Sequence, residues 1–447
     1  MRRHITFAAA LALTVVIGSA SAGVRAASEE TSASQDASAY EVWAIDQSGL
    51  AGKLYIYDGA ALTANAASAT PKVIDLATAV TPICVAQTGT SPTRAHMVLF
   101  SPTSSYAILA YVATGHVVFI HAATRAPIRC IDVGVQAHAA FPSPDGTSVV
   151  VANQNGKLLQ RITTDYATGE FALDAAATLD LATCTTPNGA PCQDPVLRPD
   201  NAPICPILDN SGRLGFVTLR GGGLFVVDVA DSPMRIVAEY DKATVHPNGC
   251  GGIQKARTMY VNAGGGTATA PREAHVYAFD LASYPKTGFN TPNSPAPATV
   301  FAHHMGDHDS HGAARVGRFA WVADRFANTV EIVDTVRDSH AGSFTVAGTL
   351  SADPAPDLLA AAPGGDYVFA SLRGPCPLTA NLAGVNNAVG TTPGVGVIAV
   401  HRGGRSGTLV GIAPIHNFDL TGTSCAPAGA PASNDRADPH ALRVRPK

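Results

Sequence analysis

The sequence predicts an all-β protein, a seven-bladed β-propeller that takes up nearly the whole chain. Pairs of short strand-like runs recur seven times, and six of the pairs are preceded by a third run of the same kind. Successive repeats are about 40–60 residues apart, which is the range of a four-stranded propeller blade. The third run missing before the first pair is found at the C-terminal end, where it would close the ring.

The N-terminal end of the chain predicts export. Two arginines precede an apolar run at 5–18, and the small residues Ala-Ser-Ala follow at 20–22. This order is typical of a secretory signal peptide, so we expect residues 1–22 to be removed and the mature protein to be periplasmic or secreted. Residues 23–39 lack any periodicity and predict a disordered lead. The propeller would then span residues 40–447 as one domain.

Composition excludes several classes of partner. Charged residues make up 14% of the chain and apolar residues 46%, which is enough to build a large core. The formal net charge of −4 leaves no basic footprint for nucleic acid. After the signal peptide, no apolar run is long enough to span a membrane.

Eight cysteines in an exported chain predict disulfides. They lie in neighbouring pairs along the sequence, and proximity alone favours Cys84 with Cys130, Cys184 with Cys192, Cys205 with Cys250, and Cys376 with Cys425. Other connectivities are open at this point, because spacing does not determine pairing.

The blades can be followed along the chain in order. Runs such as "AILAYVAT" and "GHVVFIHAA" alternate apolar and polar positions between Gly, Asn and Asp turns, which is the pattern of strands. The six internal third runs, which predict the innermost strands, are at 95–105, 137–147, 202–212, 246–256, 310–318 and 355–365. The seventh is "DPHALRVRPK" at 438–447, which we expect to pair with "YEVWAIDQ" at 40–47. No segment after residue 22 has a convincing helical period.

Candidate ligands recur where the innermost strands begin, and these beginnings converge on one mouth of the channel. Alignment on the "SPDG"-type turns puts His96 and His138 at the same place in adjacent blades. Counting back from "PGGDYVFAS" puts Asp357 there in the sixth blade, and the closing strand puts His440 there in the seventh. The other blades offer residues 203–205, 246–248 and 309–311, whose registers are less well defined by their turns.

Three imidazoles and one carboxylate are a ligand set typical of zinc, which takes four N, O or S ligands in a tetrahedron. Copper also suits imidazole and is the alternative metal. The competing interpretation is a polar channel wall that binds only water.

The repeats resemble those of seven-bladed YVTN-type propellers, as in "SPDGTSVVVANQNG" at 143–156 and "FAWVADRFANTVEIVDT" at 319–335. With "AHMVLFSP", "AHAAFPSPDG" and "DPHAL", the chain also resembles the secreted propeller metallochaperones of the AztD type. That resemblance implies a protein that delivers zinc to the solute-binding protein of a zinc ABC transporter. It also implies a mobile segment rich in His and Asp.

The segment "HHMGDHDSHG" at 303–312 matches that description. His303, His304, His308 and His311 predict a weaker, mobile second zinc site that loads or unloads the channel site. The alternative is a solvated connection between blades. The lead at 23–39 contains no His, so it offers no such segment.

No catalytic residue can be nominated, because the chain shows no Ser/His/Asp arrangement and no nucleophile elbow. Two other function classes remain beside the metallochaperone. One is a copper-dependent or quinoprotein-like redox propeller, and the other is a non-catalytic interaction propeller of the YncE-like kind. His275 falls within a second run of a pair, and we interpret it as a packing or surface residue.

Overall fold

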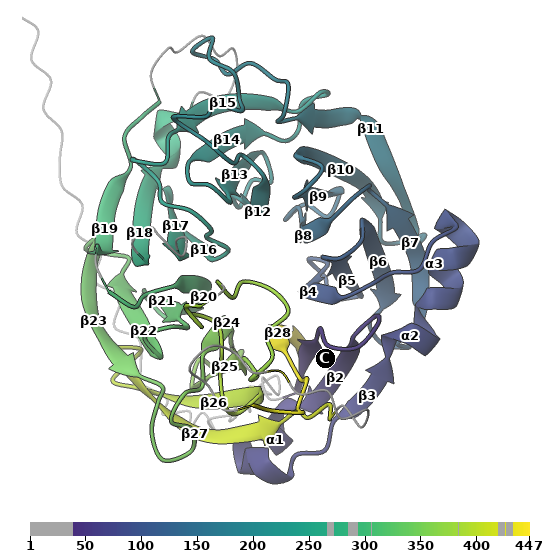
Figure 1. The fold of residues 1–447 in the computed structure, drawn as a ribbon, viewed down its shortest axis with the longest axis vertical. Coiled ribbons are helices and arrows are strands. Elements are labelled where there is room, and N and C mark those ends of the chain that lie inside the picture. Colours follow the sequence, from purple (N-terminus) through teal and green to yellow (C-terminus); the bar gives the residue numbers. More distant parts are fainter. Residues whose placement is uncertain are drawn as a thin grey trace, which may run out of the picture. The chain divides into compact units, whose positions relative to one another are not determined.

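The computed structural model describes residues 39–265, 272–284, 294–304, 306–382, 384–418, 425 and 432–447. The predicted signal peptide and residues 23–38 of the predicted lead lie outside the described residues. The described chain forms seven four-stranded antiparallel sheets arranged in a ring (Figure 1), so the predicted propeller is confirmed.

Each blade consists of four strands that follow one another from the channel to the rim, except that the seventh blade takes its innermost strand from the C-terminal end. For blades one to seven in order, the innermost strands are β4 (Ala95–Phe100), β8 (Ala137–Pro142), β12 (Pro203–Leu208), β16 (Gly252–Lys255), β20 (Ser310–Val316), β24 (Pro356–Ala361) and β28 (Pro439–Pro446). The second strands are β5 (Tyr106–Tyr111), β9 (Ser148–Asn153), β13 (Leu214–Leu219), β17 (Thr258–Gly265), β21 (Phe319–Asp324), β25 (Tyr367–Leu372) and β1 (Tyr40–Asp46). The third strands are β6 (His116–His121), β10 (Leu158–Asp165), β14 (Leu224–Asp228), β18 (Glu273–Asp280), β22 (Thr329–Asp334), β26 (Gly394–His401) and β2 (Lys53–Asp58). The outermost strands are β7 (Pro127–Asp132), β11 (Glu170–Asp180), β15 (Arg235–Tyr240), β19 (Ala298–His303), β23 (Ser339–Thr345), β27 (Ser406–Pro414) and β3 (Lys72–Asp75).

Strands from both ends of the propeller close the ring. Strand β28 pairs antiparallel with β1, with Val444 opposite Val42 and Leu442 opposite Ala44. Val42, Ala44 and Leu442 are buried and Val444 is part-buried, and the pairing covers the edge of β1 that faces the channel. The predicted pairing of residues 438–447 with 40–47 is therefore confirmed.

A β-bulge near the start of the innermost strand recurs around the ring. In six of the seven blades the innermost strand has one residue more than its partner over this stretch, for example between Ala95 and Met97 opposite Ala110 and Tyr111. A bulge re-aims the side chain that it displaces. The second residues of these six strands are His96, His138, Ile204, His311, Asp357 and His440.

The expectation of no helix was wrong for the part of the chain between β2 and β4. There α1 (Gly59–Asn65) and α2 (Leu76–Ala79) lie beside strands of the seventh blade, and α3 (Thr81–Thr88) packs against β7 of the first blade. Asp58 and Asp75 cap the first two helices by accepting backbone N–H bonds. A proline in the first turn begins α3, and left-handed Gly89 ends it. Helices of only four to eight residues span too few turns to produce a recognisable period.

Four disulfides join Cys84 with Cys130, Cys184 with Cys192, Cys205 with Cys250, and Cys376 with Cys425, so the pairing suggested by proximity is confirmed. Four disulfides in one chain are typical of proteins that work outside the cytoplasm. Separately, none of the helices in the described part of the chain has the length and hydrophobicity of a membrane span.

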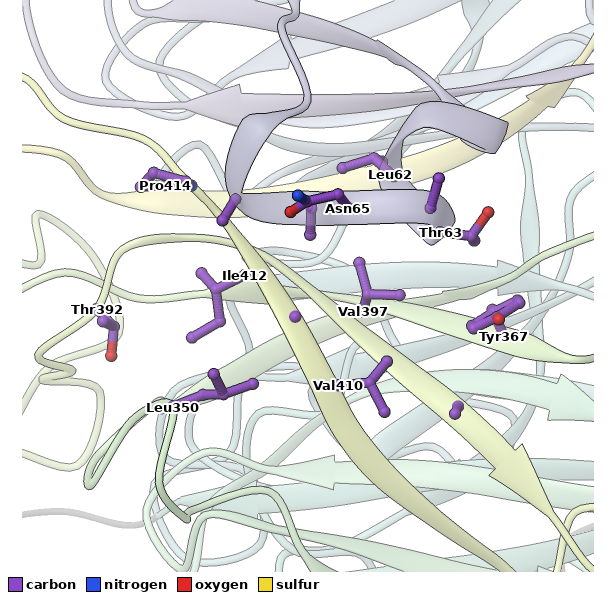
Figure 2. Close-up of a pocket in the computed structure, with 15 residues that line it drawn as sticks. Leu62, Thr63, Asn65, Leu350, Tyr367, Thr392, Val397, Val410, Ile412 and Pro414 are labelled. Carbon is purple, nitrogen blue, oxygen red and sulfur yellow. The ribbon is translucent and has the colours of Figure 1, made fainter.

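A groove on the outer side of the propeller lies between α1 and the outer strands of the sixth blade (Figure 2). Leu62 from the helix faces Val397, Val410 and Ile412 from strands β26 and β27 across a hollow of about 580 Å³. Its lining is mostly apolar, and it shares no residue with the channel cavity described next.

Candidate metal centre

A cavity of about 610 Å³ lies where the innermost strands begin. Four histidines on innermost strands line it: His96, His138, His311 and His440. Residues 378–382, which follow the second strand of the sixth blade, form another part of its wall. The cavity is therefore built from the same strand ends that the sequence marks as candidate ligands.

The structure brings together the four residues predicted for the channel site. The ring of His96 stacks on that of His440 at 3.7 Å between centroids, and lies edge-on to His138 at 4.7 Å. The Nε2 atom of His440 lies 3.7 Å from Oδ2 of Asp357. All four side chains are buried, and Asp357 and His440 are fully so.

His311 joins this cluster, although the sequence analysis grouped it with the loop. It is the second residue of β20, the position that His96, His138 and His440 occupy in their strands. Its Nε2 atom lies 3.8 Å from Oδ1 of Asp357, and its ring lies 5.6 Å from that of His440. The ligand atoms of His311, Asp357 and His440 all lie within 4.8 Å of one another.

Hydrogen bonds to Nδ1 select the tautomer of three histidines. Nδ1 of His138 lies 2.9 Å from the carbonyl of Ile204, and Nδ1 of His440 lies 3.0 Å from the carbonyl of His96. A carbonyl only accepts, so each Nδ1 must donate, and the lone pair of the neutral ring is on Nε2.

The same holds for His96, whose Nδ1 lies 3.0 Å from Oε1 of Gln47. The amide nitrogen of Gln47 donates to Asp438 and Thr379, which orients its oxygen toward the imidazole. Among the described residues, no group bonds to Nε2 of His96 or His440, and neither ring nitrogen of His311 has a partner. Several buried lone pairs therefore meet in one place.

Two buried arginines hold Asp357. Nη1 of Arg373 donates to Oδ2 at 2.5 Å, and Nη1 of Arg325 donates to Oδ1 at 3.2 Å. Arg325 also pairs with Asp309, and Arg373 also pairs with Asp438. Three carboxylates thus share two guanidinium groups, so the network has one carboxylate in excess.

Burial and neighbouring charges keep the histidines neutral. Burial lowers the pKa of His138 to about 4 and that of His440 to about 3. Burial, followed by His440 and His138, holds the pKa of His96 well below its ordinary value, and burial followed by Arg325 does the same for His311. Burial opposes ionisation of Asp357, but Arg325 and its other neighbours outweigh it, so the pKa of Asp357 is lowered. The cluster thus presents neutral imidazoles beside a carboxylate.

The other three loop histidines do not lie in this cluster. The ring of His303 stacks on that of His308 at 4.0 Å, and Nδ1 of His308 lies 2.7 Å from Oδ2 of Asp324. His304 instead faces His275, with 5.1 Å between ring centroids. The four residues of the predicted loop site are therefore distributed over three different surroundings.

Sequence reasoning missed Gln47, Arg325 and Arg373, which position the cluster. The two arginines directly follow the second strands of their blades, in "VADR" and "ASLR", and Arg220 follows "VTL" at the equivalent place in the third blade. This recurrence was visible in the sequence as an arginine directly after the second strand in three of the blades.

No protein-family model matches the sequence, and no curated protein does. Among solved structures, the chain is similar to the periplasmic gluconolactonase PpgL of Pseudomonas aeruginosa, with a TM-score of 0.52 and 14% identity over 91% of this chain and 99% of that one. It is also similar to a protein from Lactobacillus plantarum, with a TM-score of 0.53 and 11% identity over 91% and 99% of the two chains. At such identities the likeness concerns the fold alone.

Proposed function

We propose that this protein is a periplasmic metallochaperone that holds zinc at the channel cluster and passes it to the solute-binding protein of a zinc ABC transporter. One observation carries the proposal: the buried Nε2 atoms of His96 and His440 lack partners among the described residues, while their Nδ1 atoms are hydrogen-bonded. Imidazole held through one nitrogen and presenting the other is the usual arrangement of a metal-bound histidine.

The protonation states that the site favours are those that bind a dication such as zinc. Zinc binds neutral imidazole and ionised carboxylate, and these are the forms that the surroundings of His440 and Asp357 favour. His96, His138, His311 and His440 supply the imidazoles, and Asp357 the carboxylate. The carboxylate has four lone-pair positions, so two arginine bonds leave room for a metal ion.

Delivery to a partner is supported by two features. The sequence resembles the AztD type of zinc metallochaperone, and the cluster lines a cavity built from strand ends and the segment 378–382. Four disulfides fit a protein of the periplasm, where such a partner is found.

Zinc titration of the metal-free protein against a chromophoric chelator tests the binding site. We expect His96→Gln and His440→Gln to weaken zinc binding at the channel at least about 100-fold, because each removes a ligand outright. His116→Gln is the matched control, since His116 is equally buried but bonds to Thr88 of α3 and to Thr114, which precedes β6. Unchanged zinc affinity and stoichiometry in the double variant His96→Gln/His440→Gln would overturn the proposal.

A second measurement tests delivery. Zinc-loaded protein mixed with the metal-free zinc solute-binding protein should transfer the ion faster than it releases zinc to a chelator of equal affinity. Equal rates would mean that the partner only collects released zinc. A copper-dependent redox propeller would instead retain Cu(II) through purification and absorb visible light, whereas an interaction propeller would bind neither metal.

A further inference from the structure

We propose a second divalent-metal site at the rim of the fourth blade, formed by His246, Glu273 and His275 with His304 beside them. The ligand atoms of the first three residues all lie within 4.8 Å of one another. None of the three belongs to the channel cluster or to the histidine-rich loop. The site would take a borderline transition-metal ion such as zinc, which suits two imidazoles and a carboxylate.

Three segments of the fourth blade bring these residues together. His246 lies in the connection from β15 to β16, Glu273 and His275 lie on β18, and His304 directly follows β19. Glu273 and His275 are two residues apart on one strand, so their side chains share a face. Strand β19 runs beside β18 with His303 opposite Ala274, which places the end of β19 next to both residues.

One carboxylate oxygen holds both imidazoles. Oε2 of Glu273 accepts from Nδ1 of His246 at 2.6 Å and from Nε2 of His275 at 2.8 Å. The rings of His246 and His275 stack at 4.0 Å, and the ring of His304 lies edge-on to His275 at 5.1 Å. Donor atoms around tetrahedral zinc lie roughly 3.3 Å apart, so Oε2 and each of the two nitrogens need to separate by only about 0.5–0.7 Å to admit the ion. Each nitrogen becomes a ligand when its proton moves to the other nitrogen of the same ring.

The charge of Glu273 supports an ion at this place. Its side chain is nearly buried, and in the part of the chain that the structure describes no Lys or Arg pairs with it. Asp357 in the channel, by contrast, is held by two arginines. Buried carboxylates are normally paired with a cation or coordinate a metal, and a dication bound to both histidines would supply the missing charge.

The position of the site gives it a role that rests on the proposed function. The segment 304–311 begins at the rim site with His304 and ends in the channel cluster with His311. His246 is part-exposed, whereas His311 is buried. A zinc ion taken up at the rim would therefore be bound close to the segment that leads to the channel, so the rim site would serve as an uptake site.

Zinc titration of the full-length metal-free protein with zinc alone tests the site. Wild type should bind two equivalents, and His246→Ala and Glu273→Gln should each weaken one of them at least about tenfold. His246 lies in a loop, so its substitution tests the site without removing a core side chain. His340→Ala is the matched control, because His340 also pairs with a buried glutamate, Glu331 at 3.0 Å, but lies outside the rim site.

This experiment distinguishes failure of the rim-site proposal from failure of the channel-site proposal. If Glu273→Gln loses one equivalent of zinc and His96→Gln/His440→Gln keeps both, the rim site is supported and the channel site is overturned. The rim site is overturned if His246→Ala and Glu273→Gln both still bind two equivalents of zinc with wild-type affinity. It is also overturned if wild type binds only one equivalent and His96→Gln/His440→Gln loses it.

Discussion

At the scale of single residues, the oxygen atoms that accept from Nδ1 orient the histidines of the channel cluster. Gln47 orients His96 because its amide nitrogen is committed to Asp438 and Thr379 and its oxygen is left for Nδ1. Substituting an acceptor of this kind typically lowers metal affinity 10- to 100-fold while all ligands are still present.

Gln47→Leu should therefore weaken zinc binding at the channel about 10- to 100-fold, since His96 loses the acceptor that selects its tautomer. Gln154→Leu is the matched control, because Gln154 is a buried amide on the wall of the same cavity. Competition titration gives both affinities, and circular dichroism checks the fold. Equal zinc affinity in the two variants would contradict this role of Gln47.

The buried histidines also predict how stability responds to acid. The pKa of His138 is lowered from 6.5 to about 4, because burial disfavours its charged form. The unfolded chain therefore binds a proton at higher pH than the folded chain does, and stability falls as the pH drops from 6.5 toward 4. For one histidine the loss over this range is about 3 kcal/mol.

Urea unfolding of the metal-free protein at pH 7 and at pH 4 measures this loss. Wild type should lose about 3 kcal/mol more than His138→Gln between the two pH values, because the variant lacks the titrating group. Parallel losses in the two proteins would show that His138 titrates normally in the folded state.

At the scale of elements, counting from the first residue of each innermost strand predicts the site residues better than counting back from the turn that follows the strand. The sequence analysis aligned innermost strands on the turns that follow them, which located His96, His138 and Asp357. Strand β20 has seven residues and a two-residue connection to β21, so alignment from its turn is displaced. Counted from its start, His311 is the second residue, like the other histidines. The bulge sits at the start of the strand, and so the start determines which side chain faces the cluster.

Other parts of the site were not predictable from local sequence. Four histidines in ten residues suggested one loop site, but the segment comprises the end of β19, a connection and the start of β20. His303 and His308 stack on each other, His304 faces His275, and His311 lies in the channel cluster. His275 fits the alternation of an ordinary strand. Its partner His246 is 29 positions away in sequence, and only the fold brings the two together.

For the two loop histidines outside both clusters, His303 and His308, a role in loading the channel site is still a prediction. His303→Ala/His308→Ala should leave the equilibrium zinc content unchanged, because neither residue contacts the channel cluster, but should slow transfer to the solute-binding protein. Stopped-flow transfer measures the rate, with the exposed His401→Ala as control. If the double variant transfers zinc at the wild-type rate, the segment 303–312 is only a solvated connection. If the double variant loses the channel zinc, the segment is the main site.

At the scale of the whole molecule, ring closure and the proposed metal site share one strand. Strand β28 pairs with β1 to complete the seventh blade, and it also carries His440. The repeat pattern was sufficient to predict this closure, because a propeller needs an innermost strand for each blade and only one was left at the C-terminal end.

Deleting residues 438–447 should lower the melting temperature of the metal-free protein on the order of 10 °C, because it exposes the edge of β1 and the buried faces beside it. His440→Gln is the control that removes the ligand while keeping the strand. Thermal unfolding followed by circular dichroism compares the two. Equal melting temperatures would mean that the closing strand contributes little to the stability of the ring.

The most direct test of the central claim is the anomalous difference density at the zinc absorption edge in crystals of the zinc-loaded protein. A strong peak is predicted where the innermost strands begin, about 2.0–2.2 Å from histidine Nε2 atoms of the channel cluster and from Asp357. Data collected just below the edge should lack the peak, which identifies the ion as zinc. Zinc-loaded crystals with no anomalous density at His96, His138, His311 and His440 would contradict the claim.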